Sequence, residues 1–172
     1  MDVFENKLKK ESFKIFYRRF SKPFWYFILK ICGDASMADD LFQESFYRFF
    51  RAAPGAMDER QQKSYLYKTA VRLIIDQKKK IQVEAKYRNE SDGYTMKENQ
   101  NMLSMDMEKI FTLLKPRERI MLWLAYVDGY SHVEISRITG NREKSIKVQL
   151  FRIRKKFAGI LRSHGYTGEE SV

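Results

Sequence analysis

Apolar residues recur every three or four positions along most of this chain, and that spacing restricts the folds open to it. Near the C-terminus, for example, Ile146, Leu150, Ile153 and Phe157 follow one another at intervals of four, three and four residues. Residues at these intervals lie on one face of an α-helix. Because the chain contains neither an internal repeat nor a convincing pair of alternating strand segments, the sequence predicts an all-α fold.

Capping and breaking residues indicate where the N-terminal helices begin and end. Asp2 and Ser36 each precede an acidic residue at the spacing of a capping box, so each is expected to open a helix. Between them, Pro23 predicts a break and the first position of a second helix, which Gly33 would end. The inner stripe of the third helix is expected to consist of Met37, Leu41, Phe46, Phe49 and Phe50.

A polar stretch divides the chain into two helical parts. A fourth helix should start after residue 61 and end in the three lysines at 78–80. The following residues are polar and show no sustained helical period, which is typical of a flexible linker. The predicted division is a helical domain of residues 1–80, a linker of 81–103, a second helical domain of 104–163 and a disordered tail of 164–172.

The positive charge of the chain is concentrated in two segments. The formal net charge is +11, and residues 62–88 alone carry +6 while residues 142–162 carry +7. The remaining chain is therefore slightly acidic. Two separated basic segments favour a protein that contacts one nucleic acid at two places.

Composition argues against membrane insertion and against a metal or disulfide site. The longest apolar stretch, residues 24–29, is far shorter than the roughly 20 residues that a spanning helix requires. The N-terminus lacks the apolar core of a signal peptide, which favours a cytoplasmic protein. A single cysteine, Cys32, and two histidines, His132 and His164, provide no cluster of metal ligands, so no cofactor is expected.

Residues 131–157 have the pattern of a helix-turn-helix motif. Ser131 and Glu134 form a third capping box before a short apolar helix, Gly140 marks a tight turn, and a long basic helix follows. In such motifs the second helix enters the major groove of DNA. A solvated basic face is the alternative interpretation of the same helix. Its outward face is expected to carry Lys144, Lys147, Val148, Phe151, Arg152 and Lys155.

The other basic segment mixes cations with aromatic rings. Tyr65 and Tyr67 lie among Lys63, Lys68 and Arg72, a combination that can hold an unpaired nucleic-acid strand through stacking and phosphate contacts. Tyrosines at this density also occur in helical cores. From the residues alone, both interpretations stay open.

The third predicted helix carries a polar face. Asp40 and Glu44 lie one helical turn apart, with Gln43 beside them. Paired carboxylates could serve acid–base or metal chemistry, but no partner histidine, fitting further carboxylate or glycine-rich phosphate loop accompanies them. A protein-docking face is therefore expected, and no enzyme activity is predicted.

These segments, taken in order, resemble the sigma factors of the extracytoplasmic-function type in the sigma-70 family. Region 2.2 of that family is similar to GDASMADDLFQESFYRFF, regions 2.3 and 2.4 to SYLYKTAVRLIIDQKKK, and region 4 to the segment that runs from LKPRER to RIRKKF. Arg72 stands where many members carry Asn, and Val148 and Gln149 stand where Ser or Arg is common. The resemblance consequently implies the fold and the partners, but not the promoter sequence.

What the resemblance implies is a protein that directs RNA polymerase to promoters and catalyses nothing itself. The polar face of the third helix, together with Leu41, would dock on the clamp helices of the polymerase β′ subunit. The tyrosine-containing basic segment would open and read the −10 element, with the loop 53–64 helping to capture extruded bases. Region 4 would read the −35 element, with base contacts at 147, 148 and 151, and would touch the β flap. An anti-sigma factor is a further expected partner.

Two other classes of protein fit some of these features. A stand-alone helix-turn-helix transcriptional regulator would need a dimer interface to span two half-sites, and no dimerisation stripe is evident. A recombinase or nuclease with a helix-turn-helix tail would need a nucleophile or a metal cluster, and residues 1–100 offer neither.

Overall fold

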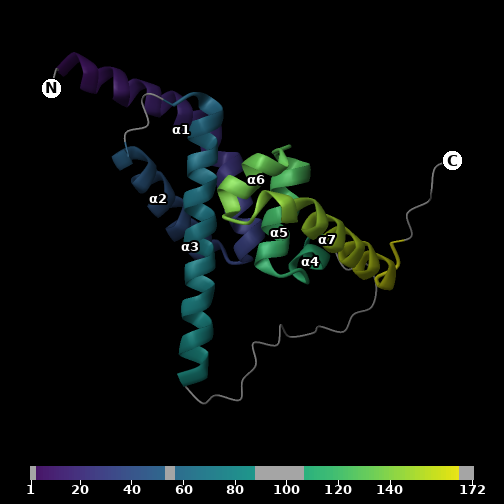
Figure 1. Cartoon of the computed structure of the whole chain (residues 1–172). Coiled ribbons are helices and arrows are strands. Elements are labelled where there is room, and N and C mark those ends of the chain that lie inside the picture. The colour runs from purple at the N-terminus through teal and green to yellow at the C-terminus, as the bar shows by residue number, and fades with distance from the viewer. Residues whose placement is uncertain (1–2, 53–56, 88–106, 167–172) are drawn as a thin grey trace.

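The computed structural model describes residues 3–52, 57–87 and 107–166, and within these ranges every regular element is helical (Figure 1). The N-terminal bundle consists of α1 (Val3–Cys32), α2 (Ala35–Ala52) and α3 (Glu59–Tyr87). The C-terminal bundle consists of α4 (Met107–Thr112), α5 (Pro116–Leu122), the π-helical turn η1 (Trp123–Val127), α6 (His132–Thr139) and α7 (Glu143–Ser163). The predicted all-α class is confirmed.

Helix α1 continues through Pro23, so the predicted break at this residue is wrong. A proline inside a helix removes one backbone hydrogen bond and costs about 3 kcal/mol. The residues that follow it offset this cost, because Phe24, Phe27 and Ile28 are almost completely buried and each such side chain stabilises the fold by about 1.5–3 kcal/mol. Tertiary packing therefore outweighs the local signal. The predicted cap at Asp2 lies outside the described residues.

Helix α2 begins at a cap that the sequence analysis placed two residues too late. Gly33 has a φ of 75°, the left-handed conformation predicted for the end of the preceding helix. The side chain of Asp34, not of Ser36, then accepts a hydrogen bond of 2.7 Å from the backbone N–H of Met37. The predicted inner stripe is also wrong at one position, because Phe50 is 47% exposed.

Helix α3 runs to Tyr87, seven residues beyond its predicted end, so residues 81–87 do not belong to a linker. These residues include no helix breaker, and Lys80 lies 4.0 Å from Glu84, the spacing of a favourable pair on one helix. Mostly exposed side chains cover this end of α3, which explains why no apolar period marked it. The remainder of the predicted linker, residues 88–103, lies outside the described residues.

The helices of the C-terminal bundle begin and end close to the capping and breaking residues that the sequence indicated. Pro116 occupies the start of α5. At the start of α6, the Glu134 carboxylate accepts the Ser131 N–H while the Ser131 hydroxyl accepts the Glu134 N–H, which completes the capping box. Gly140 ends α6 with a φ of 76°. Helix α7 ends at Ser163, at the predicted domain boundary.

The two bundles pack against each other, although the sequence predicted only a flexible linker between them. Helix α6 lies along α3, and α5 contacts α1 (Figure 1). One continuous hydrophobic cluster includes core residues of both bundles. Periodicity reveals that a side chain is buried, but it does not reveal which bundle buries it.

Two glycines of the C-terminal bundle give a matched stability test. A Cβ atom added at Gly140 or at Gly159 would meet no atom within 4 Å, so only the backbone conformation distinguishes the two sites. Gly140→Ala should destabilise the chain by about 1 kcal/mol, because an L-residue is strained at positive φ. Gly159→Ala should stabilise it by about 0.5–1 kcal/mol, because this glycine lies inside α7. Urea unfolding measures both, and shifts of the same sign would contradict this account of the turn.

Candidate nucleic-acid interface

A rigid turn joins α6 to α7 and fixes the direction of the second helix. The Ser136 hydroxyl donates to the Asn141 carbonyl oxygen at 2.7 Å. The Asn141 side-chain amide in turn donates to Gln149 on α7 at 3.2 Å. These contacts, together with the left-handed Gly140, hold α6 and α7 in a helix-turn-helix arrangement.

Helix α7 has one buried and one exposed face, as predicted. Ile146, Leu150 and Ile153 are buried against the bundle. Phe151 is 63% exposed and Val148 is 49% exposed, which is unusual for apolar side chains unless they meet a partner. All six residues proposed to contact DNA from this helix are exposed, namely Lys144, Lys147, Val148, Phe151, Arg152 and Lys155.

The cations of this face are available for phosphates. Within the described residues, none of its four lysine and arginine side chains forms an ion pair. By contrast, Lys156, which lies elsewhere on α7, is held by Glu118 at 2.7 Å. Unpaired cations beside exposed apolar groups suit a surface that enters a DNA groove.

On α3, three of the four predicted nucleic-acid contacts lie on a common face. Tyr65, Lys68 and Arg72 are spaced three and four residues apart. Arg72 is exposed, while Tyr65 and Lys68 are half-buried. The Tyr65 ring packs against Phe49, with 6.0 Å between the ring centroids. The predicted loop 53–64 is wrong in its second half, because α3 already begins at Glu59; residues 53–56 lie outside the described residues.

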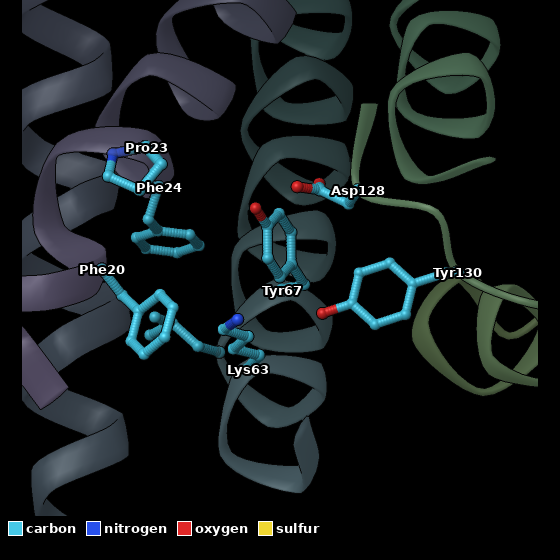
Figure 2. Close-up of a pocket in the computed structure, with 8 residues that line it drawn as sticks. Phe20, Pro23, Phe24, Lys63, Tyr67, Asp128 and Tyr130 are labelled. Atoms are coloured by element: carbon cyan, nitrogen blue, oxygen red, sulfur yellow. The ribbon is translucent and has the colours of Figure 1, made fainter. Parts of the chain in front are cut away.

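The fourth predicted contact, Lys63, is turned away from the other three. Its ammonium group lies 4.0 Å from the centroid of the Phe20 ring, a cation–π geometry, and 3.4 Å from Glu59. Lys63 also lines a cavity of about 190 Å³ between the two bundles (Figure 2). The structure thus separates Lys63 from the group that the sequence analysis assembled.

The cavity brings Tyr67, which the sequence analysis placed among the candidate stacking residues, together with two residues that it did not assign to a site. Tyr67 of α3 and Tyr130 of the C-terminal bundle have ring centroids 5.8 Å apart, and Asp128 lines the same cavity (Figure 2). Burial raises the pKa of the Asp128 carboxyl. Burial, and then the neighbouring Asp128 carboxylate, raises the pKa of Tyr130 to about 12. No local sequence pattern marks this meeting of residues some 60 positions apart.

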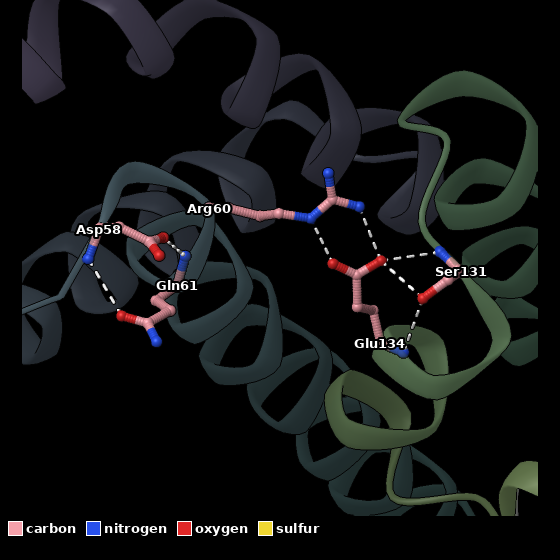
Figure 3. A network of polar contacts seen from close by, with 5 residues as sticks. All are labelled: Asp58, Arg60, Gln61, Ser131 and Glu134. Carbon is pink, nitrogen blue, oxygen red and sulfur yellow. Dashed lines mark hydrogen bonds and ion pairs between the residues drawn. The ribbon is translucent and has the colours of Figure 1, made fainter.

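A second polar contact joins the bundles at the start of α6. Arg60 donates to both carboxylate oxygens of Glu134, through Nε to Oε1 and through Nη2 to Oε2 at 2.8 Å (Figure 3). The same carboxylate also accepts from the Ser131 N–H at 2.9 Å and from its hydroxyl at 2.7 Å. These donors, above all Arg60, lower the pKa of Glu134 to about 2. Glu134 therefore caps α6 and binds α3 at the same time.

The polar face of α2 is partly as predicted. Asp40 and Gln43 are exposed, and Glu44 is half-buried beside Arg48, with which it forms an ion pair of 2.6 Å. Leu41, which was predicted to contact the polymerase, is only 7% exposed and belongs to the hydrophobic core. The Leu41 side chain therefore packs beneath the polar face and is not exposed on it.

The described residues contain neither a cluster of metal ligands nor a membrane-spanning helix. No group of three or more His, Cys, Asp or Glu side chains lies close enough to hold a metal ion there. Nor does any helix in those ranges have the length and apolarity needed to cross a membrane.

Comparison with known proteins relates both bundles to the same family. The family model described as Sigma-70 region 2 matches residues 16–83, and the one described as Sigma-70, region 4 matches residues 104–157. A similar solved structure is the sigma factor RpoE in complex with the anti-sigma factor NepR from Bartonella quintana. It has a TM-score of 0.68 and 18% sequence identity, and the match covers 88% of this chain and 98% of that chain. No curated protein matches the chain.

Proposed function

The chain belongs to the sigma-70 family, and we propose a division of its work as a sigma factor among α2, α3 and α7. It is a sigma factor of the extracytoplasmic-function type, which directs RNA polymerase to promoters at transcription initiation. The N-terminal bundle corresponds to region 2 and the C-terminal bundle to region 4. We further propose that it acts in the cytoplasm and has no enzymatic activity of its own.

The reading of the −35 element is assigned to α7. The observation that carries this assignment is an exposed face that combines unpaired cations with Val148 and Phe151, directly after a rigid helix-turn-helix turn. The resemblance to the family places the base-contacting positions at 147, 148 and 151. Lys147, Val148 and Phe151 are therefore proposed to contact bases, and Lys144, Arg152 and Lys155 to contact phosphates.

The reading of the −10 element is assigned to α3. Tyr65, Lys68 and Arg72 share a face opposite the buried residues of the helix, on which Arg72 is exposed and the other two are half-buried. A ring with two flanking cations can hold an extruded base and the adjacent phosphates. Lys63 is also proposed to contact the −10 DNA, from a face of α3 that points away from the other three residues.

Docking on the polymerase is assigned to the polar face of α2. Asp40, Gln43 and Glu44 are proposed to contact the β′ clamp helices, and Trp25 holds α2 in place by donating to Asp39 at 2.7 Å. Region 4 is proposed to contact the β flap. An anti-sigma factor is a further proposed partner, which the solved complex of the similar sigma factor RpoE with NepR supports.

The docking proposal predicts a loss of core binding after charge reversal on α2. Asp40→Lys with Glu44→Lys should weaken binding to core RNA polymerase at least tenfold, because the complementary surface would then be repelled. The unfolding free energy should change by no more than about 1 kcal/mol, because Asp40 is exposed and the Glu44–Arg48 pair that is lost is a surface ion pair. Affinity is measured by fluorescence anisotropy with labelled chain.

A matched double variant controls for net charge in this experiment. Glu11→Lys with Asp76→Lys makes the same change in charge at exposed positions on α1 and α3, and it should leave core binding within twofold of the wild type. If the two double variants bound core RNA polymerase with equal affinity, the assignment of α2 as the docking helix would be wrong.

The assignment of α7 predicts two kinds of DNA-binding defect. Lys147→Ala should relax base preference at one position of the −35 element by about 1–3 kcal/mol. Lys155→Ala should weaken binding to all sequences alike and reduce the slope of log K against log salt by roughly one unit. The measurement is holoenzyme binding to single-base −35 variants at several salt concentrations. A uniform loss of affinity for Lys147→Ala would show that this lysine contacts a phosphate and that the orientation of α7 is incorrect.

A further inference from the structure

Gln149 lies among the residues of α7 that are proposed to read the −35 element, yet its side chain already has partners within the chain. It follows Val148 directly and is half-buried. Its amide nitrogen donates to the Ser145 hydroxyl at 2.7 Å, and its amide oxygen accepts from the side-chain amide of Asn141 at 3.2 Å. Both polar groups of the Gln149 side chain therefore bind the protein.

The position of Gln149 on the helix explains these partners. Side chains of an α-helix point back toward its N-terminus, so Gln149 reaches past Ser145, one turn earlier, to the turn that precedes α7. Successive residues of a helix are about 100° apart around its axis, which places Gln149 between exposed Val148 and buried Ile153. Gln149 thus lies at the edge between the exposed face of α7 and the core.

Asn141 connects this contact to the rest of the C-terminal bundle. Its carbonyl oxygen accepts from the Ser136 hydroxyl of α6 at 2.7 Å, and its side-chain amide also lies 3.9 Å from the Met121 sulfur of α5. The Ser145 hydroxyl in turn donates to the Arg142 carbonyl oxygen at 2.7 Å. A continuous chain of polar contacts therefore joins α5, α6, the turn and the start of α7.

These hydrogen bonds argue against direct base reading by Gln149. A glutamine that reads adenine uses its amide oxygen and its amide nitrogen together, on N6 and N7 of the base. To do so, Gln149 would have to give up its bonds to Asn141 and Ser145, which would leave two half-buried polar side chains without these partners. Gln149 consequently acts on the protein side of the helix.

A side chain with both a donor and an acceptor at its end is needed at this position. The Ser145 hydroxyl already donates to a carbonyl oxygen, so its partner at 149 must be a donor. The side-chain amide of Asn141 donates, so its partner must be an acceptor. Arginine has donors only and a carboxylate has acceptors only, whereas glutamine has both.

We propose that Gln149 is a positioning residue, which sets the base preference of α7 without touching DNA. Through Asn141 and Ser145 it fixes the angle at which α7 leaves the turn. The three residues proposed to contact bases lie within one helical turn of Gln149, so a small rotation of α7 moves all of them relative to the base edges. The inference rests on the proposed function, because it assigns a role within the reading of the −35 element.

A double-variant cycle separates positioning from direct contact. Gln149→Met keeps the length of the side chain and removes its hydrogen bonds, and Asn141→Ala removes the partner in the turn. Each should change the base preference of the holoenzyme by about three- to tenfold, and the double variant should exceed neither, because both changes break the same contact. The measurement is holoenzyme binding to a panel of single-base −35 variants.

Ser145 provides a matched pair of controls within the same network. Ser145→Thr keeps the hydroxyl that Gln149 binds and should leave the base preference within about twofold of the wild type, whereas Ser145→Ala should change it in the same direction as Gln149→Met. Circular dichroism checks that each variant has the helicity of the wild type. If Asn141→Ala does not fold, Ser145→Ala takes its place in the cycle.

Three results of the cycle would overturn the proposal. A preference that changes in Gln149→Met but not in Asn141→Ala would show that Gln149 contacts a base directly. Unchanged preference in both variants would limit the network to a structural role. Effects that multiply in the double variant would show that the two residues act independently.

The side-chain amide signal of Gln149 in the NMR spectrum of the free full-length chain tests the network without DNA. It should shift in Asn141→Ala and in Ser145→Ala but much less in Ser145→Thr, and a signal that stayed constant in all three would contradict the contact itself. A wild-type holoenzyme that bound every −35 variant equally would instead contradict the proposed function, and this inference with it, even where the NMR result confirmed the contact.

Discussion

Helix α3 is packed on two sides, against the N-terminal bundle and against the C-terminal bundle. This packing determines which of its side chains can reach nucleic acid. Leu66, Ala70 and Ile74 enter the core of the N-terminal bundle, while Tyr67 meets Tyr130 of the C-terminal bundle. The face opposite Leu66 and Ala70 is left to Tyr65, Lys68 and Arg72. Burial of one flank therefore determines which side chains of a strongly basic helix remain open to nucleic acid.

The same principle orients the other DNA-reading helix. Ile146, Leu150 and Ile153 anchor α7, and the cations on its far side find no carboxylate within the described part of the chain. The six residues of its basic face are all exposed, so the contact between the bundles does not cover them.

Sequence patterns predicted the features that depend on contacts between residues close together in the chain. The Ser131 and Glu134 capping box, the left-handed Gly140 and the exposed face of α7 depend only on residues within a few turns of one another. The family resemblance placed Leu41 in the docking segment. In the structure its side chain is buried in the hydrophobic core, which the resemblance alone did not indicate.

Features that depend on tertiary contacts were missed or misplaced for a common reason. Pro23 is tolerated inside α1 because Phe24 and Phe27, which follow it, are buried against distant aromatic side chains. The Arg60–Glu134 pair likewise joins residues 74 positions apart. Neither leaves a periodic signal in the sequence. The division into two bundles could be predicted, but their mutual contact could not, since apolar spacing is the same whichever bundle a side chain faces.

The central claim is that this chain gives core RNA polymerase the ability to start transcription at defined promoters. The most direct measurement combines core polymerase with genomic DNA, with and without the chain, and sequences the 5′ ends of the transcripts. The account predicts a limited set of start sites that appear only with the chain and that share two upstream elements near −10 and −35. Transcripts identical in both reactions, from a chain shown to be folded, would contradict it.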